Sequence, residues 1–334
     1  MISDKNDQLR VMVTGANGFV GKVLTDCLIN KDIQVVPCIR KLGPETNFGD
    51  SAVCECGDIN KATNWQEALS GVDTVVHTAA RVHVMSDKSS NPLDEFRRVN
   101  VDATLNLARQ ASKAGVKRFI YLSSVKVNGE SSAYGNSLKS SDSINPVGPY
   151  AISKLEAEQQ LFKLSWDTGL EIVIIRPPLI YGPGVKANFA MLASAVRRGL
   201  PLPLGKITQN VRSMVSLDNL VDFISVCLQH PAAANEVFMV SDGEDVSTAD
   251  LVLRMAKVYK RNIWLIPVPI SALDKAAYLV SKQDVLARLV GSLQVDIQKN
   301  FDLLNWKPKM NLDDGLSVAL ASRVMSRITQ GSKL

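Results

Sequence analysis

Three glycines constrain the fold of this chain more than any other feature of its sequence. Gly15, Gly18 and Gly21 follow a strand pattern at Arg10–Thr14 and open an amphipathic helix pattern over Val20–Asn30. Glycines at this spacing permit a tight turn, a close approach of the backbone to a pyrophosphate, and close packing of helix on strand. The free N–H groups and the dipole at the helix N-terminus favour bound phosphates. The unit is therefore predicted to bind a dinucleotide, through Gly15, Asn17, Gly18, Phe19 and Val20.

The first half of the chain alternates apolar strand patterns with helix patterns. Strands are expected at Ile33–Ile39, Ala52–Glu55, Thr74–His77, Arg118–Leu122 and Glu171–Arg176, and helices over Asp102–Ala114 and from Ser153 to about Trp166. Strands separated by helices of this length form a parallel sheet with right-handed crossovers. We therefore expect an α/β fold with a Rossmann-type doubly wound parallel sheet, whose NAD(P)-binding domain covers residues 1–176.

The alternation ends after Arg176, where prolines and short elements begin. Helices are expected at about Phe189–Arg198, at Asp218–Gln229 and at Ala249–Tyr259, the last capped by Ser247 or Thr248, and strands at Ser213–Val215 and Val237–Val240. We assign residues 177–334 to a smaller C-terminal lobe that closes over the carboxyl edge of the sheet, where ligands of open α/β sheets bind. A strand from residues 213–240 is expected to complete the large sheet.

Composition excludes several classes of protein. The net charge is only +5, and Lys and Arg form no run longer than two residues, which argues against a nucleic-acid partner. The five cysteines and three histidines lack the spacing of a disulfide framework or a metal site, so no metal is expected. Residues Met1–Gln8 are polar, and no apolar run reaches the ~18 residues of a membrane span. We expect a cytoplasmic protein without a transmembrane segment.

Cations stand where the second strand ends. Arg40 and Lys41 occupy the position at which an acid would bind the ribose 2′-hydroxyl of NAD. Two cations there favour a 2′-phosphate, so NADP(H) is favoured and NAD(H) stays possible. A solvated strand end is the alternative interpretation of the same two residues.

The ends of the next two strands add further cofactor contacts. Asp58, followed by Ile59, comes after the third strand, where a carboxylate accepts a hydrogen bond from the adenine amino group. Ala79 and Ala80 follow the fourth strand and are small enough for the backbone to lie against the cofactor. His77, just before them, is expected to be a packed core histidine without a catalytic role.

A tyrosine and a lysine four residues apart predict the reacting group. Tyr150 and Lys154 lie on one face at the start of a helix. We expect the Lys154 ammonium to lower the pKa of the Tyr150 phenol towards neutral pH, which makes a general acid–base beside a nicotinamide. Lys154 is also expected to hold the nicotinamide ribose. Ser123 and Ser124 end a strand upstream, and one of them is expected to bond the same substrate oxygen.

Together these motifs resemble those of the extended short-chain dehydrogenase/reductases, over nearly the whole chain. Aligning Val127-Asn128-Gly129 with the Val-Tyr-Gly of that family makes Ser124 the catalytic serine, and Arg176-Pro177-Pro178 adds Pro177 to the cofactor contacts. Asn100 matches an asparagine that supports the active-site helix, and Leu304–Pro308 is similar to the family's Leu-Gly-Trp-x-Pro. The resemblance implies a homodimer formed by the helices at Asp102–Ala114 and Ser153–Trp166.

The resemblance also implies a substrate class, because extended members mostly act on UDP- or dTDP-sugars. Asn188 resembles the contact to the nucleotide diphosphate, and Arg212 resembles the arginine that reaches ribose and phosphate. Arg81 and His83, in a stretch shared with one subgroup, are the other expected substrate contacts. Residues 177–334 are thus expected to bind a nucleotide sugar.

Three stretches, at residues 77–85, 176–186 and 291–296, look like that subgroup, the reductases of O-antigen synthesis similar to UDP-N-acetylquinovosamine dehydrogenase. The expected reaction is reduction of the 4-keto group of a UDP-4-keto-6-deoxy-N-acetylhexosamine. A UDP-sugar 4-epimerase with retained NAD is the alternative, although Pro178 and Leu179 stand where UDP-glucose 4-epimerase carries an asparagine. A dehydratase is disfavoured, because no carboxylic acid follows Ser124. A non-catalytic NADP-binding protein is a remote alternative, since such members usually lose the tyrosine or the lysine.

One segment fits none of these motifs. Residues Ile270–Val290 are apolar at helical spacing around three cations, Lys275, Lys282 and Arg288. We expect the segment to pack in the core or the lobe, and a membrane-surface helix is the alternative.

Overall fold

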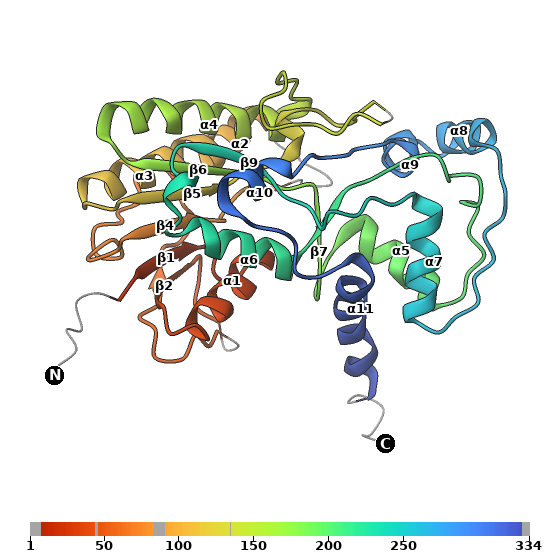
Figure 1. Cartoon of the computed structure of the whole chain (residues 1–334), viewed down its shortest axis with the longest axis horizontal. Helices are drawn as coiled ribbons and strands as arrows, with labels where there is room; N and C mark the ends of the chain where they lie inside the picture. Colours follow the sequence, from red (N-terminus) through yellow and green to blue (C-terminus); the bar gives the residue numbers. More distant parts are fainter. Residues whose placement is uncertain (1–7, 44–45, 83–90, 134, 329–334) are drawn as a thin grey trace.

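A large sheet with helices on both faces and a smaller lobe beside it make up the protein (Figure 1). The computed structural model describes residues 8–43, 46–82, 91–133 and 135–328, and the side chains up to Ala321. Among the predicted site residues, His83 lies outside these ranges. None of the helices within the described ranges is both long enough and apolar enough to cross a membrane.

The large sheet has seven parallel strands in the order β3-β2-β1-β4-β5-β6-β9. Its strands are β1 (Arg10–Thr14), β2 (Gln34–Ile39), β3 (Cys54–Glu55), β4 (Thr74–His77), β5 (Arg118–Leu122), β6 (Glu171–Arg176) and β9 (Glu236–Met239). The strand order reverses between β1 and β4, which is where ligands bind in sheets of this kind. The predicted Rossmann-type α/β fold is confirmed.

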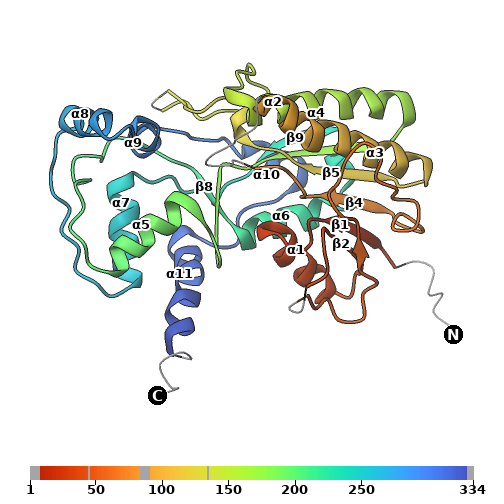
Figure 2. The same ribbon diagram turned by 180° about the vertical axis from the view of Figure 1, so that it is seen from behind.

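Helices cover the sheet in two layers. On one face lie α1 (Phe19–Ile29) and α6 (Leu217–Cys227), and on the other α3 (Thr104–Lys113) and α4 (Gly148–Thr168), as Figures 1 and 2 both show. Alternate residues of β1 pack into opposite layers: Val11 and Val13 join the cluster under α1 and α6, whereas Met12 joins the cluster under α3 and α4. Burial on both faces explains why the strands are apolar throughout.

The lobe is built from short elements around its own apolar cluster. It contains β7 (Leu179–Tyr181) paired with β8 (Met214–Ser216), and the helices α5 (Ala187–Arg197), α7 (Thr248–Val258), α8 (Ile270–Leu279), α9 (Gln283–Val290) and α11 (Leu312–Ile328). A further helix, α10 (Gln298–Leu304), runs beside β9. Ser247 caps α7, because its side chain accepts a hydrogen bond of 3.0 Å from the amide of Asp250.

Two helices begin earlier than their sequence patterns suggest. The pattern expected at Asp102–Ala114 is preceded by α2 (Pro92–Arg97) and a π-helical turn at Arg98–Ala103, so the chain is helical from Pro92 onwards. The helix expected from Ser153 begins at Gly148, where Pro149 stands in the first turn. A proline in the first turn is favourable because its missing N–H needs no partner there. Tyr150 therefore lies inside α4.

The apolar segment Ile270–Val290 meets the expectation of a packed segment only in part. It forms two helices, α8 and α9, and only Ala277 and Leu286 are buried within them. Leu279 is 82% exposed, so the pattern does not represent a core helix. Leu273, Leu289 and Val290 are the side chains of this segment that pack partly against the lobe cluster.

Candidate active site

The glycine turn is too tight for any side chain. Gly15 has a φ of +66°, and a Cβ there would lie 3.1 Å from the backbone nitrogen of Ala79. A Cβ on Gly21 would lie 2.1 Å from the carbonyl oxygen of Gly15. Gly18 is the N-cap of α1, no side chain caps the helix, and Asn17 and Phe19 beside it are exposed. A bare helix N-terminus behind a glycine turn fits the pyrophosphate of a dinucleotide.

Threonines hold the neighbouring strand end against this turn. Thr78 Oγ1 donates to the carbonyl of Thr14 at 2.6 Å, and the amide of Ala79 donates to Thr14 Oγ1 at 3.3 Å. The predicted contact Ala79 therefore lies beside Gly15, and Ala80 is the next residue along the chain. The two ends form one cradle from β1 and β4.

His77, the last residue of β4, joins the two strand ends of this cradle by a hydrogen bond. Its ring nitrogens form hydrogen bonds with the hydroxyls of Thr14 (2.7 Å) and Thr104 (2.9 Å). Burial lowers the pKa of His77 to about 3, with a further contribution from the Lys154 ammonium. His77 is 1% exposed and neutral, as a packed core histidine is.

The predicted adenosine contacts meet at the ends of β2 and β3. Arg40 Nε lies 2.9 Å from Asp58 Oδ1, so one expected cofactor residue forms an ion pair with another. Lys41 is exposed beside them, and Ile59 is half-buried. The carboxylate of Asp58 partly neutralises the cation that a 2′-phosphate would use.

Ser124 and Tyr150 form the centre of the candidate catalytic site. Ser124 follows β5 and opens a short 3-10 turn at Val125–Val127, where its Oγ accepts from the amide of Lys126 at 3.3 Å. Its side chain also lies near the Tyr150 hydroxyl, where it lowers the pKa of that phenol. The carbonyl of the predicted cofactor contact Pro177 accepts from the amide of Val125, at 3.0 Å, and so holds this turn.

The pKa of Tyr150 moves opposite to the expected direction. Burial raises the pKa of Tyr150 to about 12, and the nearby Ser124 side chain opposes that rise only in part. The expected lowering by Lys154 does not prevail, and the Lys154 Nζ donates to the carbonyl of Leu122 at 2.9 Å and lies 4.4 Å above the Tyr121 ring. The chain by itself thus holds Tyr150 as a protonated phenol, which is a proton donor.

Lys154 is buried with only 2% of its surface exposed. Burial lowers the pKa of Lys154 to about 7, and the carboxylate of Glu158 opposes that shift. An amine with a pKa near neutrality changes its charge readily. Lys154 lies one helical turn from Tyr150, so a ligand that contacts the tyrosine lies within reach of a hydrogen bond or charge interaction with the lysine.

A buried network that the sequence motifs did not reveal lies under the two serines. Glu158 accepts hydrogen bonds from Ser123 Oγ and from Arg176, whose Nε lies 3.1 Å from Glu158 Oε1. Arg176 Nη1 donates in turn to Asn128 Oδ1 at 2.9 Å. Because Ser123 is engaged with Glu158, Ser124 is the serine that faces Tyr150. The available signal was the spacing of Glu158, four residues after Lys154 on the same helix.

Further support for Tyr150 comes from α2 and the π-helical turn. The Phe96 ring meets the Tyr150 ring edge-on at 6.0 Å, and the guanidinium of Arg81 lies 5.5 Å above Phe96. The Asn100 side chain accepts from the amide of Arg81 and donates to Ser153 Oγ at 3.0 Å. The π turn thus joins Arg81, expected to bind substrate, to the helix that carries Tyr150.

The other expected substrate residues lie in the lobe. Asn188 is half-buried in the first turn of α5. Arg212 donates from Nη1 to the carbonyls of Arg288 (2.8 Å) and Gly291 (2.9 Å), at the end of α9. This arginine therefore also fastens α9, a role that its sequence motif did not suggest.

A chain of backbone hydrogen bonds connects Arg212 to the loop after Ser124. The amide of Ser213 donates to Leu293, and the amide of Ser132 donates to Ser292, both at 2.9 Å. Leu138 is bonded to Gln294 in the same way. The loop of the large domain and the substrate side of the lobe thus meet along residues 291–295.

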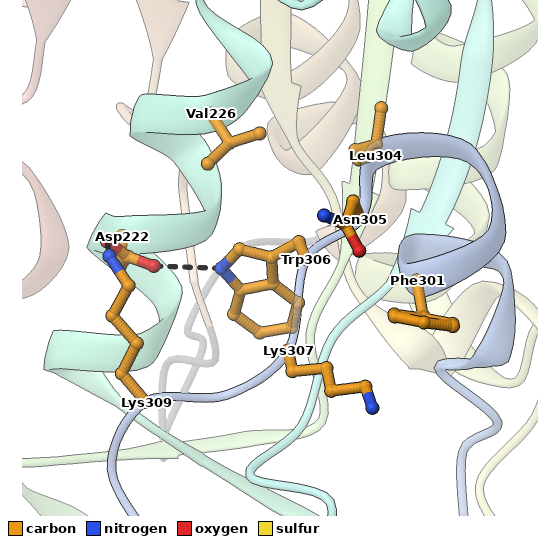
Figure 3. A pocket seen from close by; sticks show the side chains of 8 residues that line it. All are labelled: Asp222, Val226, Phe301, Leu304, Asn305, Trp306, Lys307 and Lys309. Carbon is orange, nitrogen blue, oxygen red and sulfur yellow. Dashed lines mark hydrogen bonds and ion pairs between the residues drawn. The ribbon is translucent and has the colours of Figure 1, made fainter.

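A separate pocket lies between α6 and the segment formed by α10 and the residues after it, and none of the predicted site residues line it (Figure 3). Trp306 Nε1 donates to Asp222 at 2.8 Å, and its ring packs on Phe223 with centroids 4.8 Å apart. The tryptophan motif at residues 304–308 therefore fastens the C-terminal segment to α6. Across the part of the chain with described side chains, no group of three or more His, Cys, Asp or Glu residues is placed to hold a metal ion.

Comparisons with known proteins show which proteins this chain is similar to. Residues 11–241 match the model of the NAD dependent epimerase/dehydratase family. The chain is 47% identical over 313 residues to a UDP-glucose 4-epimerase of Vibrio cholerae, covering 93% of this chain and 94% of that protein. It is 29% identical over 290 residues to an N-acetyl-alpha-D-glucosaminyl-diphospho-ditrans,octacis-undecaprenol 4-epimerase of Escherichia coli O157:H7, covering 84% and 81%.

The fold also matches solved structures. A UDP-glucose 4-epimerase of Thermotoga maritima, solved with UDP-glucose, superimposes with a TM-score of 0.75 over 96% of this chain and 100% of that one. The sequences are 20% identical, so this likeness concerns the fold.

Proposed function

The chain belongs to the NAD dependent epimerase/dehydratase family, and we propose that it is a UDP-sugar 4-epimerase of this family. The observation that carries the proposal is the 47% identity to the Vibrio cholerae UDP-glucose 4-epimerase, which extends over 93% of this chain. The candidate site supports it, because Ser124, Tyr150 and Lys154 are all present and lie at the carboxyl end of the sheet. The reaction proposed is inversion at C4 of a UDP-hexose.

The proposed chemistry moves one proton on the C4 oxygen. A bound nicotinamide supplies a hydride acceptor and donor, and in its oxidised form a positive charge that favours the Tyr150 phenolate. Tyr150 takes the proton from the C4 hydroxyl and returns it after the sugar has presented its other face. Ser124 holds the same oxygen by a hydrogen bond, and Lys154 holds the nicotinamide ribose.

We propose NAD, retained through the catalytic cycle, as the cofactor. The glycine cradle at Gly15 and Gly21 fits its pyrophosphate. The sequence-based preference for NADP loses support from the ion pair between Arg40 and Asp58, because the carboxylate offsets the cation offered to a 2′-phosphate. NADP remains the second choice.

For the substrate, we propose that residues 177–334 bind the nucleotide sugar. Asn188 would bind the diphosphate, Arg212 the ribose and phosphate, and Arg81 the sugar side near Phe96. The hydrogen-bonded contact between residues 291–295 and the loop after Ser124 supports the placement, because it joins these residues to the catalytic site.

The second candidate is the 4-ketoreductase expected from the sequence. It rests on the three stretches shared with that subgroup and on Arg40 and Lys41, which suit an exchangeable NADPH. The same Tyr150 would then donate its proton once, to the C4 oxygen of a UDP-4-keto-6-deoxy-N-acetylhexosamine.

One pair of assays separates the two candidates. The purified protein is incubated without added cofactor with UDP-glucose, and in parallel with UDP-N-acetylglucosamine, and the C4 configuration is followed by NMR. Appearance of the C4 epimer of either sugar supports the epimerase. Oxidation of NADPH by UDP-4-keto-6-deoxy-N-acetylglucosamine, with no epimer formed from either sugar, overturns it in favour of the reductase.

A further inference from the structure

Glu158 is a buried residue that contacts Ser123, the neighbour of Ser124, and shares helix α4 with Tyr150 and Lys154. It lies on α4, one turn after Lys154, and is 2% exposed. Its carboxylate receives Ser123 Oγ from the strand end of β5 and the Nε and Nη2 atoms of Arg176 from β6. Three elements that bear on the site therefore meet at one buried carboxylate.

The bond to Ser123 fixes the backbone from which Ser124 extends. The amide of Ser123 donates to the carbonyl of Ile175 at 2.7 Å, so Ser123 is held at its backbone by β6 and at its side chain by Glu158. Ser124 is the next residue, and its side chain lies near enough to Tyr150 to lower the pKa of that phenol. A shift of Ser123 would move Ser124 relative to the Tyr150 hydroxyl.

Charge gives Glu158 a second effect. Arg176, 3% exposed, forms an ion pair with Glu158, and Lys154, 2% exposed, lies one helical turn before Glu158 on α4. An unpaired buried cation is strongly disfavoured. The carboxylate of Glu158 favours the charged form of Lys154, in opposition to the effect of burial.

The other described groups around Lys154 do not supply a negative charge that would favour its charged form. On the neighbouring strands stand His77 on β4, neutral through burial, the Tyr121 ring on β5, and Arg176 on β6. Burial raises the pKa of Tyr150 on α4, which favours its neutral phenol. Among these described neighbours, Glu158 is the group that carries a negative charge.

We propose that Glu158 is a positioning residue for the Tyr150–Lys154 chemistry: it holds Ser124 in register through Ser123 and favours the charged form of Lys154. The proposal rests on the proposed function for its activity readout, since Tyr150 and Lys154 must carry the reaction. Glu158 is only 2% exposed, so the proposed role acts through Ser123 and Lys154 and not on a ligand.

The first test separates this role from a purely structural one. Glu158→Gln leaves Arg176 without a counter-charge and is expected to lose stability for that reason alone, so Glu158→Gln/Arg176→Met is made beside it. A buried ion pair can be replaced by neutral side chains without loss of fold. The double variant is expected to fold and yet to keep a lowered kcat, with KM for the UDP-sugar changed less than kcat. Recovery of wild-type kcat in the double variant would overturn the proposal.

The pH profile gives the direction of the charge effect. Without the carboxylate, Lys154 loses its proton at a lower pH, so the alkaline fall of kcat is expected to move down by about one pH unit or more. A retained alkaline limb in the folded double variant counts against the effect on Lys154.

A second test does not depend on activity. Unfolding free energies are measured from pH 6 to pH 10 for the wild type, Glu158→Gln, Lys154→Met and the combined variant. The coupling between the two positions is expected at pH 6, where Lys154 is charged, and is expected to vanish above its pKa of about 7. A coupling that is the same at both ends of the range overturns the electrostatic part. An inactive wild type that shows the pH-dependent coupling would sink the proposed function alone.

Discussion

Arg40 Nε and Asp58 Oδ1 lie 2.9 Å apart, so an ion pair joins the carboxyl ends of β2 and β3. The two side chains are 78% and 77% exposed, and exposed pairs of this kind contribute about 0–1 kcal/mol. Such a pair is strong enough to bias a neighbouring charge but too weak to fix the arginine. A single substitution in this ion pair is therefore expected to change the preference between NAD, with its ribose hydroxyl, and NADP, with its 2′-phosphate.

Replacing Asp58 by Asn is expected to shift cofactor preference towards NADP. The change removes the negative charge beside Arg40 and releases the guanidinium for a 2′-phosphate, by about 0.5–1 kcal/mol, or roughly two- to fivefold in the ratio of the two Kd values. Titration of both dinucleotides into protein stripped of bound nucleotide measures the ratio. Asp26→Asn, an exposed change on α1, serves as the control, and an unchanged ratio in Asp58→Asn contradicts the expectation.

A methyl group on Gly21 is expected to abolish tight cofactor retention. Its Cβ would lie 2.1 Å from the Gly15 carbonyl oxygen, so α1 must move away from the turn that holds the pyrophosphate. Nucleotide released on denaturation, measured by chromatography, should fall to background. Gly43→Ala is the matched control, because the nearest atom to its Cβ is Thr46 Oγ1 at 3.7 Å. Full nucleotide content in Gly21→Ala would show that the cradle does not hold the cofactor.

Tyr150→Phe is expected to lower kcat for C4 inversion by about 10²–10⁴-fold, the usual effect of removing a general acid–base. The ring contact with Phe96 is kept, so the fold and the bound cofactor should survive. The rate is followed by NMR of the sugar, and nucleotide content is measured on the same preparation. Tyr278→Phe on α8, where the tyrosine is 72% exposed, should behave as the wild type. A comparable loss in both variants would argue against a special role for Tyr150.

Acid should destabilise the protein through His77. Its pKa is about 3 in the folded protein against 6.5 in the unfolded chain. The unfolded state therefore binds more protons between these values, and stability falls as pH drops through this window, by at most about 1.4 kcal/mol per pH unit. Unfolding midpoints of His77→Asn should vary less steeply between pH 6.5 and 4 than those of the wild type. His230→Gln is the control, and equal slopes for wild type and His77→Asn would refute the assignment.

Local motifs carried most of what the sequence predicted. The turn at Gly15–Gly21 needs only residues that are neighbours in the chain, and β1 and α1 lie within a residue of where the pattern put them. Tyr150 and Lys154 share one helix face for the same reason. Such features arise from helix and strand geometry, which a short stretch of sequence determines.

Contacts between distant residues could not be derived in this way. The pair of Glu158 and Arg176 depends on α4 lying under β6, and the pair of Arg40 and Asp58 depends on β3 lying beside β2. The direction of the Tyr150 pKa was missed because burial, which no spacing reveals, outweighs the lysine four residues away. The exposure of Leu279 was missed because apolar spacing does not say what lies opposite the helix.

The position of Phe96 beside Tyr150 depends on the number of residues in the π-helical turn at Arg98–Ala103 more than on which side chains the turn carries. A residue added to a helical turn rotates the rest of the helix by about 100° about its axis. Before the turn, Phe96 and Arg97 face Tyr150 and Glu156 of α4, whereas after it Leu105 faces the sheet. Substitutions at the exposed Arg98 or Asp102 are expected to leave these two orientations unchanged. Loss or gain of one residue there would rotate one half of the helix against the other and turn Phe96 away from the catalytic tyrosine.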